Sequence, residues 1–366
     1  MINIKRIGNI FDKICSYENI KEAHKMASKD KHDYTEVVMV NKNPDYFIKR
    51  IQKMLKEGTY TITNKNYKHK VIVDNGKRRD LYKLSYYPHR IIQWAIILQI
   101  GKYLEKNFTA DTYSSIKNRG LHTAAMAIRR DLDMYPEKTK YCLKIDITKY
   151  YPSIDNNILF DKLKRKFKDN KLLNLLHIII FSMGDKGQPI GSLWSQFAGN
   201  FYLSELDHLL KEKYDVEFYY RYCDDLVILS SDKYFLHKTR ATIFFVLSNL
   251  KLNMKNNYQV FNIEKRGIDF LGYRFYPNYT ILRKRTLNNM IAKTRKLINK
   301  PILSYSDVCT IASYVGILKY CNGYKLFCKY IKPFNNKKAK NCNQELILIN
   351  LKYKPFKKDW CHKECI

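Results

Sequence analysis

The sequence predicts a fold of the α+β or α/β class, in which strands and crossing helices share one core. Three short stretches carry the β-branched and aromatic residues typical of strands, and they cover residues 68–84, 140–147 and 217–231. Longer stretches between them repeat apolar residues at helical spacing. With 366 residues, the chain is long enough for two or three domains.

The net charge indicates the class of partner. The sequence holds 67 Lys and Arg against 34 Asp and Glu, a formal charge of +33. A field of this sign attracts polyanions and makes their binding depend on salt. We therefore expect nucleic acid as the partner. An anionic membrane is the rival, but neither a lipidation signal nor an amphipathic surface helix is evident in the sequence.

The apolar runs are too short for a membrane-spanning helix. The longest, residues 91–100 and 172–183, fall short of the roughly 20 residues that a span requires. The N-terminal segment carries charge within its apolar part, unlike a signal peptide. Nine cysteines without framework spacing indicate reduced thiols. These patterns predict a cytoplasmic protein with no membrane partner.

The first half of the chain is expected to fold as helices around one hairpin. Residues 1–50 form an N-terminal helical extension in this interpretation, and one helix is expected to begin at Asn43 and end at Gly58. An Asp-Asn-Gly turn within residues 68–84 predicts a basic hairpin. A further helix is expected at 121–132.

Beyond residue 139 the pattern is densest. A strand over 140–147 is followed by a helical stretch over 157–184, a loop with a helix after it, and the hairpin 217–231. The last 84 residues, 283–366, hold 19 Lys and Arg against 4 Asp and Glu. That composition predicts a basic helical domain.

Three aspartates stand where a metal-dependent reaction would need them. Transfer of a nucleotidyl group uses two divalent cations about 3.5–4 Å apart, held by carboxylates that converge on one rigid sheet. Asp146 ends an apolar strand, and Asp224 and Asp225 occupy the turn of a hairpin. Taken singly, Asp146 is explained equally well as a helix N-cap, and the Asp-Asp pair better as a solvated turn. Their order and strand context together favour a metal site.

These motifs resemble those of reverse transcriptases. YCDD at 222–225 resembles the Tyr-X-Asp-Asp signature of that family, and DITKYY at 146–151 resembles its first metal-binding motif. Other matching segments follow in the expected order over roughly residues 45–282: GKRRDLYKL, HRIIQWAI, DTYSSIKNRGLHTA, IGSLWSQ, LKLNMKNN and GIDFLGY. The resemblance implies an α+β right-hand polymerase, with fingers and an antiparallel-sheet palm over 51–282 and a basic helical thumb over 283–366.

Carried over residue by residue, the resemblance implies a role for each matching position. The ligands of two Mg²⁺ ions would be Asp146, Ile147, Asp224 and Asp225. Tyr151 would be the steric gate against a ribonucleotide, and Lys255 would protonate the leaving pyrophosphate. The triphosphate of the incoming dNTP would be gripped from Lys77, Arg78 and Arg79, with Arg79 the first choice. The primer grip would be Gly267, Phe270, Leu271 and Gly272.

The nucleotide pocket departs from the usual family pattern. Its expected residues are Ile190, Gly191, Ser195 and Gln196, where most of the family has glutamine in place of Ile190 and proline in place of Gln196. Isoleucine can fill space but cannot form hydrogen bonds, so we expect a pocket that discriminates less between base pairs. An aliphatic residue, glycine and then Ser-Gln resembles the enzymes of diversity-generating retroelements.

The expected function is therefore RNA-directed DNA synthesis, error-prone at template adenines, in a bacterial or phage-encoded protein. The resemblance implies template RNA, a DNA primer or RNA–DNA duplex, and a small basic accessory protein oligomer as partners. A bacterial defence-associated or retron-type reverse transcriptase is the alternative within the enzymes. A catalytically idle RNA-binding scaffold is the alternative from another class.

Overall fold

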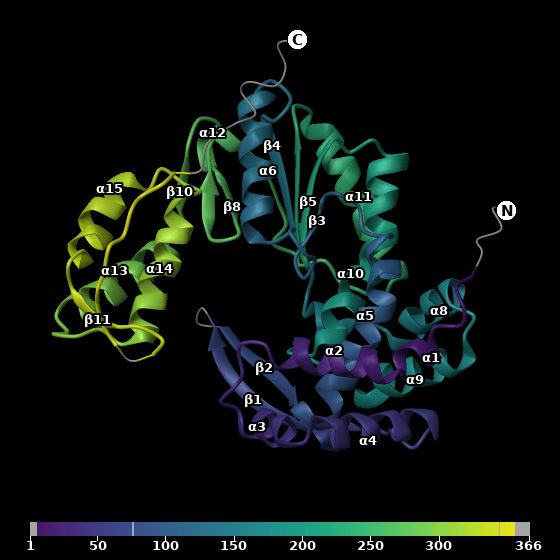
Figure 1. The fold of residues 1–366 in the computed structure, drawn as a ribbon. Coiled ribbons are helices and arrows are strands. Elements are labelled where there is room, and N and C mark those ends of the chain that lie inside the picture. Colours follow the sequence, from purple (N-terminus) through teal and green to yellow (C-terminus); the bar gives the residue numbers. More distant parts are fainter. Residues whose placement is uncertain (1–5, 75–76, 344, 356–366) are drawn as a thin grey trace, which may run out of the picture.

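A computed structural model describes residues 6–74, 77–343 and 345–355. A central sheet lies in the middle of the molecule, with the N-terminal helices and the hairpin of β1 (Tyr67–Asp74) and β2 (Lys77–Leu84) below it and the C-terminal helices to the left (Figure 1). Within these described residues no helix is both long enough and apolar enough to cross a membrane.

The central sheet has five strands in the order β3-β5-β6-β4-β7. Their bounds are β3 Thr112–Tyr113, β4 Tyr141–Asp146, β5 Phe218–Tyr222, β6 Asp225–Ser230 and β7 Gln259–Asn262. The strand over 140–147 and the hairpin over 217–231 are thus confirmed. All pairings are antiparallel except that of β3 with β5, which is parallel. This parallel pair makes the sheet mixed at one edge. A crossover of about a hundred residues joins the two strands, since a parallel pair cannot be joined by a hairpin.

Both faces of this sheet are buried. Alternate residues of β6 point to opposite faces, so that Leu226 and Ile228 join one hydrophobic core and Val227 and Leu229 join another. Helix α11 (Lys233–Asn249) packs on the first face, and α6 (Leu121–Met134) packs on the second. Double burial explains why these strands are continuous apolar runs in the sequence.

The N-terminal half forms a helical layer that supports a long hairpin. Its helices are α1 (Phe11–Ile14), α2 (Tyr17–Ser28), α3 (Thr35–Lys42), α4 (Pro44–Lys56) and α5 (Ile91–Glu105). The Asn43 side chain caps α4 by accepting a hydrogen bond from the Tyr46 N–H, which confirms the expected start. Strands β1 (Tyr67–Asp74) and β2 (Lys77–Leu84) pair antiparallel, as expected. The asparagine and glycine of their turn lie outside the described residues.

The helical stretch expected over 157–184 is present as two helices with a break between them. They are α8 (Asn156–Lys166) and α9 (Asn170–Ile180). Asp169 causes the break, because its side chain accepts a hydrogen bond from the Leu172 N–H and caps α9. Its other carboxylate oxygen accepts from the N–H groups of Ile10 and Phe11 at 2.8 and 2.9 Å. Helix α10 (Leu193–His208) then follows the loop, as the sequence predicts.

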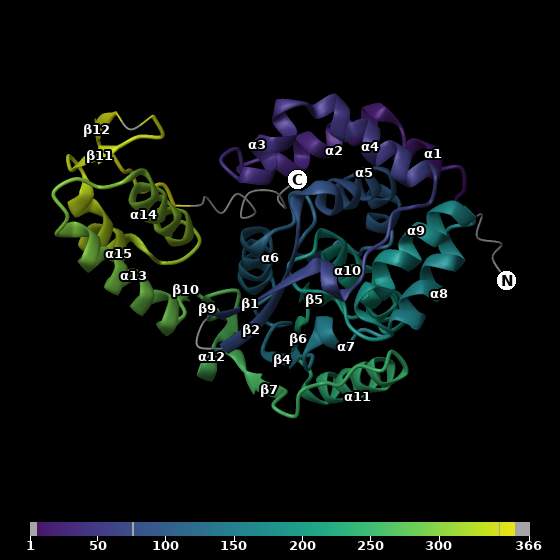
Figure 2. The same ribbon diagram turned by 90° about the horizontal axis from the view of Figure 1, so that it is seen from below.

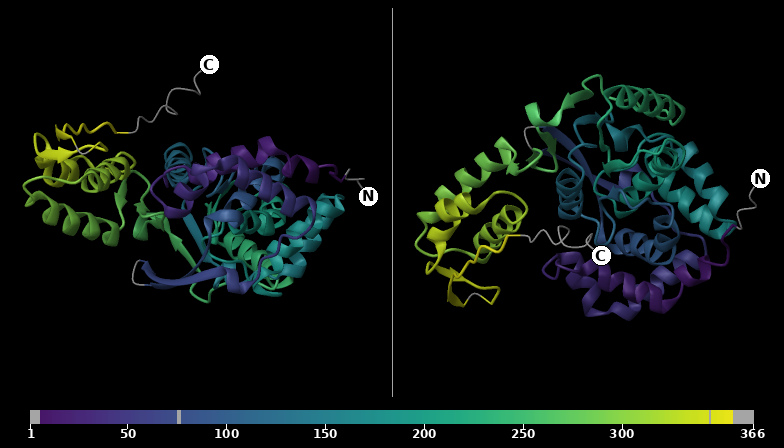
Figure 3. Two further views of the ribbon diagram at one scale, coloured as in Figure 1. Left: turned by 60° about the horizontal axis from the view of Figure 1, so that its bottom comes forward. Right: turned by 90° about the horizontal axis from the view of Figure 1, so that it is seen from above.

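The C-terminal part stands to one side of the sheet and is reached through a small second sheet (Figures 2 and 3). That sheet contains β8 (Ile268–Phe270), β9 (Tyr273–Phe275) and β10 (Thr280–Leu282), and the helices beyond it are α13 (Lys284–Ile298), α14 (Tyr305–Leu318) and α15 (Tyr324–Leu326). The expected helical character is present, but a short hairpin is added, formed by β11 (Lys338–Lys340) and β12 (Leu346–Leu348).

Short helices and turns complete the chain. They are α7 (Tyr150–Ser153), α12 (Ile263–Arg266), η1 (Asn64–Asn66), η2 (Tyr86–Arg90), η3 (Phe181–Met183), η4 (Leu209–Lys213), η5 (Phe327–Ile331) and η6 (Lys332–Phe334). Of the boundaries expected from sequence, that at residue 50 falls inside α4, and that at residue 282 falls at the end of β10.

Candidate active site

The strand register brings the candidate carboxylates together. In the pairing of β4 with β6, Asp146 lies directly opposite Asp225, and Asp224 occupies the turn between β5 and β6. The backbone of Ile147 continues this contact, because its N–H donates to the carbonyl of Asp224 at 3.3 Å. Asp146 is not a helix N-cap, since it belongs to β4 and the residue at the N-cap position of the following helix α7 is Lys149.

Burial and mutual repulsion act on this cluster. Burial, followed by the negative charges of Asp146 and Asp225, raises the pKa of Asp224 to about 6. The pKa of Asp225 is also raised, first by burial and then by Asp146, while the nearby Lys144 ammonium opposes the shift. Carboxyl groups whose pKa is raised by burial and by neighbouring carboxylates are typical of a site that gains a positive charge when its ligand binds.

A lysine holds the third carboxylate. Lys255 Nζ lies 2.6 Å from Asp146 Oδ2, and the Lys255 N–H donates to the Asp146 carbonyl at 2.9 Å. The other oxygen, Asp146 Oδ1, is buried and has no hydrogen-bond partner among the described residues. A buried acceptor of this kind is unfavourable unless another group binds to it.

These residues suit a hard divalent cation by ligand type, because carboxylate oxygens are the ligands that Mg²⁺ prefers. Ile147 is fully buried, so only its main-chain carbonyl could contribute. Within the part of the chain that the structure describes, no three His, Cys, Asp or Glu side chains lie close enough together to enclose a metal ion.

Tyr151 lies beside the catalytic turn. Its hydroxyl donates to Cys223 Sγ at 3.8 Å. A Cβ atom at Gly199 would lie 3.0 Å from the Tyr151 ring, so the glycine on α10 allows the ring its position. Burial raises the pKa of Tyr151, which keeps the phenol neutral. The neighbouring Tyr150 is buried and donates its hydroxyl to the Gly199 carbonyl.

The predicted nucleotide-pocket loop is held by two elements from the N-terminal half. The Tyr82 N–H of β2 donates to the Ile190 carbonyl at 2.9 Å. Gln93 Oε1 of α5 accepts from Ser192 Oγ at 3.1 Å and from the Leu193 N–H at 3.2 Å. Sequence reasoning missed both supporting residues. The one available signal for Gln93 is a polar residue inside an apolar helical run.

The four predicted pocket residues differ in accessibility. Ile190 is half-buried, while Gly191 and Gln196 are exposed. Gly191 has a φ of +103°, a conformation that favours glycine. Ser195 is 1% exposed, and its hydroxyl has no partner among the described residues. A direct contact between the Ser195 side chain and a nucleotide is therefore absent from this conformation.

The predicted triphosphate-binding residues lie on the hairpin. Lys77, Arg78 and Arg79 are the first residues of β2, and Arg78 and Arg79 are exposed. In the strand register Arg78 stands opposite Val73 and Arg79 opposite Ile72. Directly opposite residues share one face, so the two arginines point to opposite faces of the hairpin.

The predicted primer grip is the tight turn between β8 and β9. Leu271 and Gly272 have φ values of +53° and +86°, the pattern of a type I′ turn. Phe270 is fully buried and anchors the strand, and a Cβ atom at Gly267 would come within 2.8 Å of Arg274 and Tyr276.

Three residues that sequence reasoning missed connect this turn with the carboxylates. Lys144 Nζ donates to the Asp269 carbonyl and lies 3.9 Å from Asp225 Oδ1. The Asp269 carboxylate pairs with the Arg283 guanidinium, and the main-chain N–H of Arg283 donates to the Gly272 carbonyl at 2.9 Å. Long-range contacts of this kind leave no periodic signal in a sequence.

Comparison with known proteins agrees with this geometry. The model of the family "Reverse transcriptase (RNA-dependent DNA polymerase)" matches residues 65–275, more than half of the chain. The retron Ec73 reverse transcriptase of Escherichia coli is 24% identical over 266 residues, which cover 67% of this chain and 81% of that protein.

Two telomerase structures, each in complex with a fragment of telomeric RNA, are also similar. That of Candida tropicalis has a TM-score of 0.42 and 14% identity, and covers 65% of this chain and 49% of its own. That of Candida albicans has a TM-score of 0.46 and 12% identity, and covers 79% and 61%. The chain thus spans about half to three-fifths of these telomerase chains. On the family match and the paired aspartates, the chain belongs to the reverse transcriptases, RNA-directed DNA polymerases of the right-hand fold, with the central sheet as palm.

Proposed function

We propose that this chain copies an RNA template into DNA from dNTPs by two-metal nucleotidyl transfer, with Mg²⁺ as the cation. The observation that carries the proposal is the register of β4 against β6, which sets Asp146 opposite Asp225 and beside Asp224. In this proposal Asp146, Asp224, Asp225 and the Ile147 carbonyl hold the ions. When bound, the ions would supply activation of the attacking hydroxyl and stabilisation of the leaving group.

The other side chains bind and orient the reactants. Arg78 or Arg79, or Lys77 before them, grips the triphosphate by charge-assisted hydrogen bonds. The Tyr151 ring excludes a 2′-hydroxyl. Lys255 releases Asp146 and gives a proton to the departing pyrophosphate, which is consistent with its Nζ lying 2.6 Å from Asp146.

The primer and template make up the remaining substrates. The turn with Phe270, Leu271 and Gly272, together with Gly267 just before β8, would hold the primer end. RNA–DNA duplexes are bound mainly through backbone phosphates, which suits a chain with a formal charge of +33. A small basic accessory protein and a cytoplasmic location in a bacterial host belong to this proposal.

The Asp224→Ala variant separates an enzyme from an RNA-binding scaffold. We expect it to lose DNA synthesis and to keep its affinity for a primed RNA, because the substitution leaves the basic surface unchanged. Primer extension and fluorescence anisotropy on the same preparation measure the two properties. A variant that still extends the primer would exclude the proposed catalytic site.

The pocket residue Ile190 favours an error-prone enzyme of a diversity-generating retroelement. An isoleucine offers no hydrogen bond to the nascent base pair, so discrimination at template adenine falls. We expect Ile190→Gln to lower the error rate opposite adenine while polymerisation survives. Sequencing of the cDNA measures the rate for each template base. An unchanged adenine error rate in an active variant would remove Ile190 as the cause.

A second candidate is a retron-type or defence-associated reverse transcriptase. The similarity to the retron Ec73 reverse transcriptase supports it, since 67% of this chain is covered. The same sequencing experiment distinguishes the two candidates. Errors concentrated opposite adenine favour the diversity-generating class, whereas low and even errors favour the retron or defence class.

A further inference from the structure

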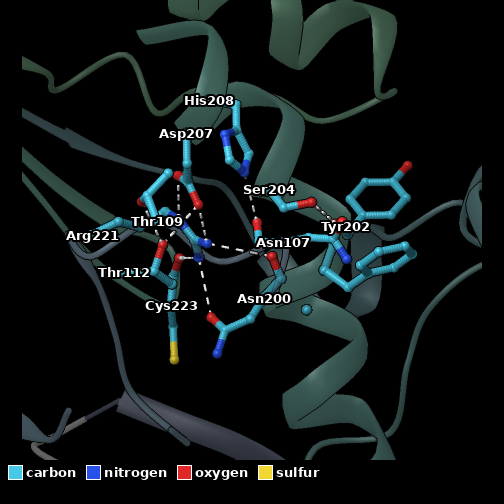
Figure 4. Close-up of polar contacts among 12 residues, drawn as sticks. Asn107, Thr109, Thr112, Asn200, Tyr202, Ser204, Asp207, His208, Arg221 and Cys223 are labelled. Carbon is cyan, nitrogen blue, oxygen red and sulfur yellow. Dashed lines mark hydrogen bonds and ion pairs between the residues drawn. The ribbon is translucent and has the colours of Figure 1, made fainter. Parts of the chain in front are cut away.

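A buried ion pair lies behind the catalytic turn, and the sites described above do not use it. Arg221 of β5 and Asp207 of α10 are each 0% exposed. The guanidinium donates through Nε to Asp207 Oδ1 at 2.7 Å and through Nη2 to Asp207 Oδ2 at 2.5 Å (Figure 4). The contact is therefore bidentate, the geometry that fixes an arginine most firmly.

Further hydrogen bonds fix both partners. Asp207 also accepts from the hydroxyls of Tyr219 at 2.7 Å and Thr112 at 3.0 Å. Arg221 Nη1 donates to the Asn200 side-chain oxygen at 3.2 Å (Figure 4). The network thereby joins β5, α10 and the edge strand β3.

The network reaches the catalytic turn at Cys223, the residue before Asp224. Arg221 Nη1 donates to the Cys223 carbonyl at 3.1 Å, and Ser114 Oγ lies 3.0 Å from Cys223 Sγ. Cys223 has a φ of +54°, which costs free energy for a residue with a side chain and persists only where neighbours enforce it. The Arg221 contact is one such neighbour.

Stability alone gives little reason for a charged pair at this position. The cost of removing two charges from water is so large that apolar residues of similar volume are often as stable. The Arg221 guanidinium does hold helix α10 and the catalytic turn in a fixed relative geometry. Such geometry matters for a reaction, because a displacement of about 1 Å at a reacting group can reduce a rate by about 100-fold.

We propose that Arg221, held by Asp207, is a positioning residue that sets the Cys223 carbonyl and, through it, the carboxylate of Asp224. This inference rests on the proposed function, because Asp224 is the group that is positioned. Neither Arg221 nor Asp207 touches a substrate in this account.

The test replaces the pair by neutral residues of similar size, Arg221→Met with Asp207→Asn. The asparagine oxygen can still accept a hydrogen bond from Tyr219, and its amide NH2 can donate to the Thr112 hydroxyl, so chiefly the contacts of the guanidinium are lost. The matched control is Lys162→Met with Glu205→Gln. Lys162 is also buried, 2.8 Å from Glu205, and Glu205 lies on the same helix α10.

For each variant the measurements are thermal unfolding, kcat and KM in primer extension, and Mn²⁺ affinity by electron paramagnetic resonance. We expect the Arg221 and Asp207 double variant to lose ~100-fold in kcat. Its Mn²⁺ affinity should weaken, while KM for primed RNA stays within twofold. The control should change the melting temperature without changing kcat or Mn²⁺ affinity.

A folded double variant with kcat and Mn²⁺ affinity equal to the control would overturn the proposal. Should the double variant fail to fold, Arg221→Lys decides, since lysine keeps the charge and loses the fork. A kcat loss in that variant supports positioning, and an unchanged kcat or a failure to fold assigns the pair to stability alone. If the unmodified chain made no DNA, the proposed function would fail, whereas the Mn²⁺ comparison would still test positioning.

Discussion

The raised pKa of Asp224 shows how its surroundings affect the ionisation of a single side chain. Its pKa in the folded chain, about 6, exceeds the ordinary value of 3.8, so folding favours the protonated acid. The corresponding stabilisation is complete below pH 3.8 and is lost as the pH rises through 6. At neutral pH the metal-free protein therefore carries a destabilising carboxylate at its candidate active site.

This imbalance predicts the effect of Asp224→Asn in EDTA. The free energy of unfolding at pH 7.5 should rise by roughly 2 kcal/mol, because the neutral amide avoids the cost of ionisation, and by little near pH 4. Urea unfolding at both pH values measures the difference. Asp161→Asn on the exposed face of α8 is the control and should show no such pH dependence. Equal effects of Asp224→Asn at both pH values would contradict the electrostatic account.

The ring of Tyr151 is expected to determine selectivity for the sugar of the incoming nucleotide. The Tyr151→Ala variant should incorporate ribonucleotides ~10–200-fold more readily relative to deoxyribonucleotides, because the ring no longer fills the space of a 2′-hydroxyl. Single-nucleotide extension with dGTP and GTP measures the ratio. Tyr150→Phe is the matched control, since Tyr150 is buried and its hydroxyl is committed to Gly199. An unchanged ratio for Tyr151→Ala would exclude the gate.

At the scale of single residues, the sequence predicts the candidate catalytic residues better than it predicts the residues that hold them in place. Asp146 and the YCDD turn are identifiable because strand patterns flank them, and the register of β4 and β6 then pairs Asp146 with Asp225. Gln93 and Lys144 were missed because their partners lie 99 and 125 residues away in the chain. Arg221 was missed because its partners Asp207 and Asn200 belong to a different element, α10. No local pattern specifies such a partner.

At the scale of elements, local signals succeed where a cap or a turn decides. The start of α4 follows from Asn43, whereas the division of 157–184 into two helices depends on Asp169, which also binds the distant N–H groups of Ile10 and Phe11. Similarly, the parallel pairing of β3 with β5 depends on the crossover between them. Tertiary contacts of this kind explain what helical spacing alone could not predict.

The turn between β8 and β9 should depend on glycine at position 272 for its conformation. Gly272→Ala should destabilise the protein by ~1 kcal/mol, because the residue has a φ of +86°. It should also weaken binding of a primed RNA if the turn holds the primer. Gly316→Ala in α14 is the control, since a Cβ atom meets nothing within 4 Å there and alanine favours a helix. Urea unfolding and anisotropy measure the two effects, and equal stability of both variants would contradict the turn assignment.

At the scale of the whole molecule, charge and shape act together. The basic helix α13 and its neighbour α14 stand apart from the palm and are joined to it through β8–β10, on the side opposite to α9 (Figures 1 and 2). Composition predicted that this part would be a basic helical domain. The resemblance to reverse transcriptases supplied its expected place as a thumb.

The affinity for a primed RNA should therefore depend steeply on salt. With six to ten phosphate contacts, a fall of about 10³-fold or more is expected between 50 and 200 mM salt. Lys293→Gln with Lys296→Gln on the exposed face of α13 should reduce the slope by about 2, whereas Lys171→Gln on α9 should leave it unchanged. Anisotropy titrations measure these slopes. An equal slope in all three proteins would contradict a nucleic-acid-binding role for α13.

The central claim is that Asp146, Asp224 and Asp225 form the site of RNA-directed DNA synthesis. The most direct measurement supplies the purified chain with Mg²⁺, dNTPs and a primed RNA that contains all four bases, and then sequences the product. The account predicts cDNA complementary to the template from the unmodified chain and none from Asp146→Asn or Asp224→Ala. Equal amounts of cDNA from the unmodified chain and from either variant would contradict it.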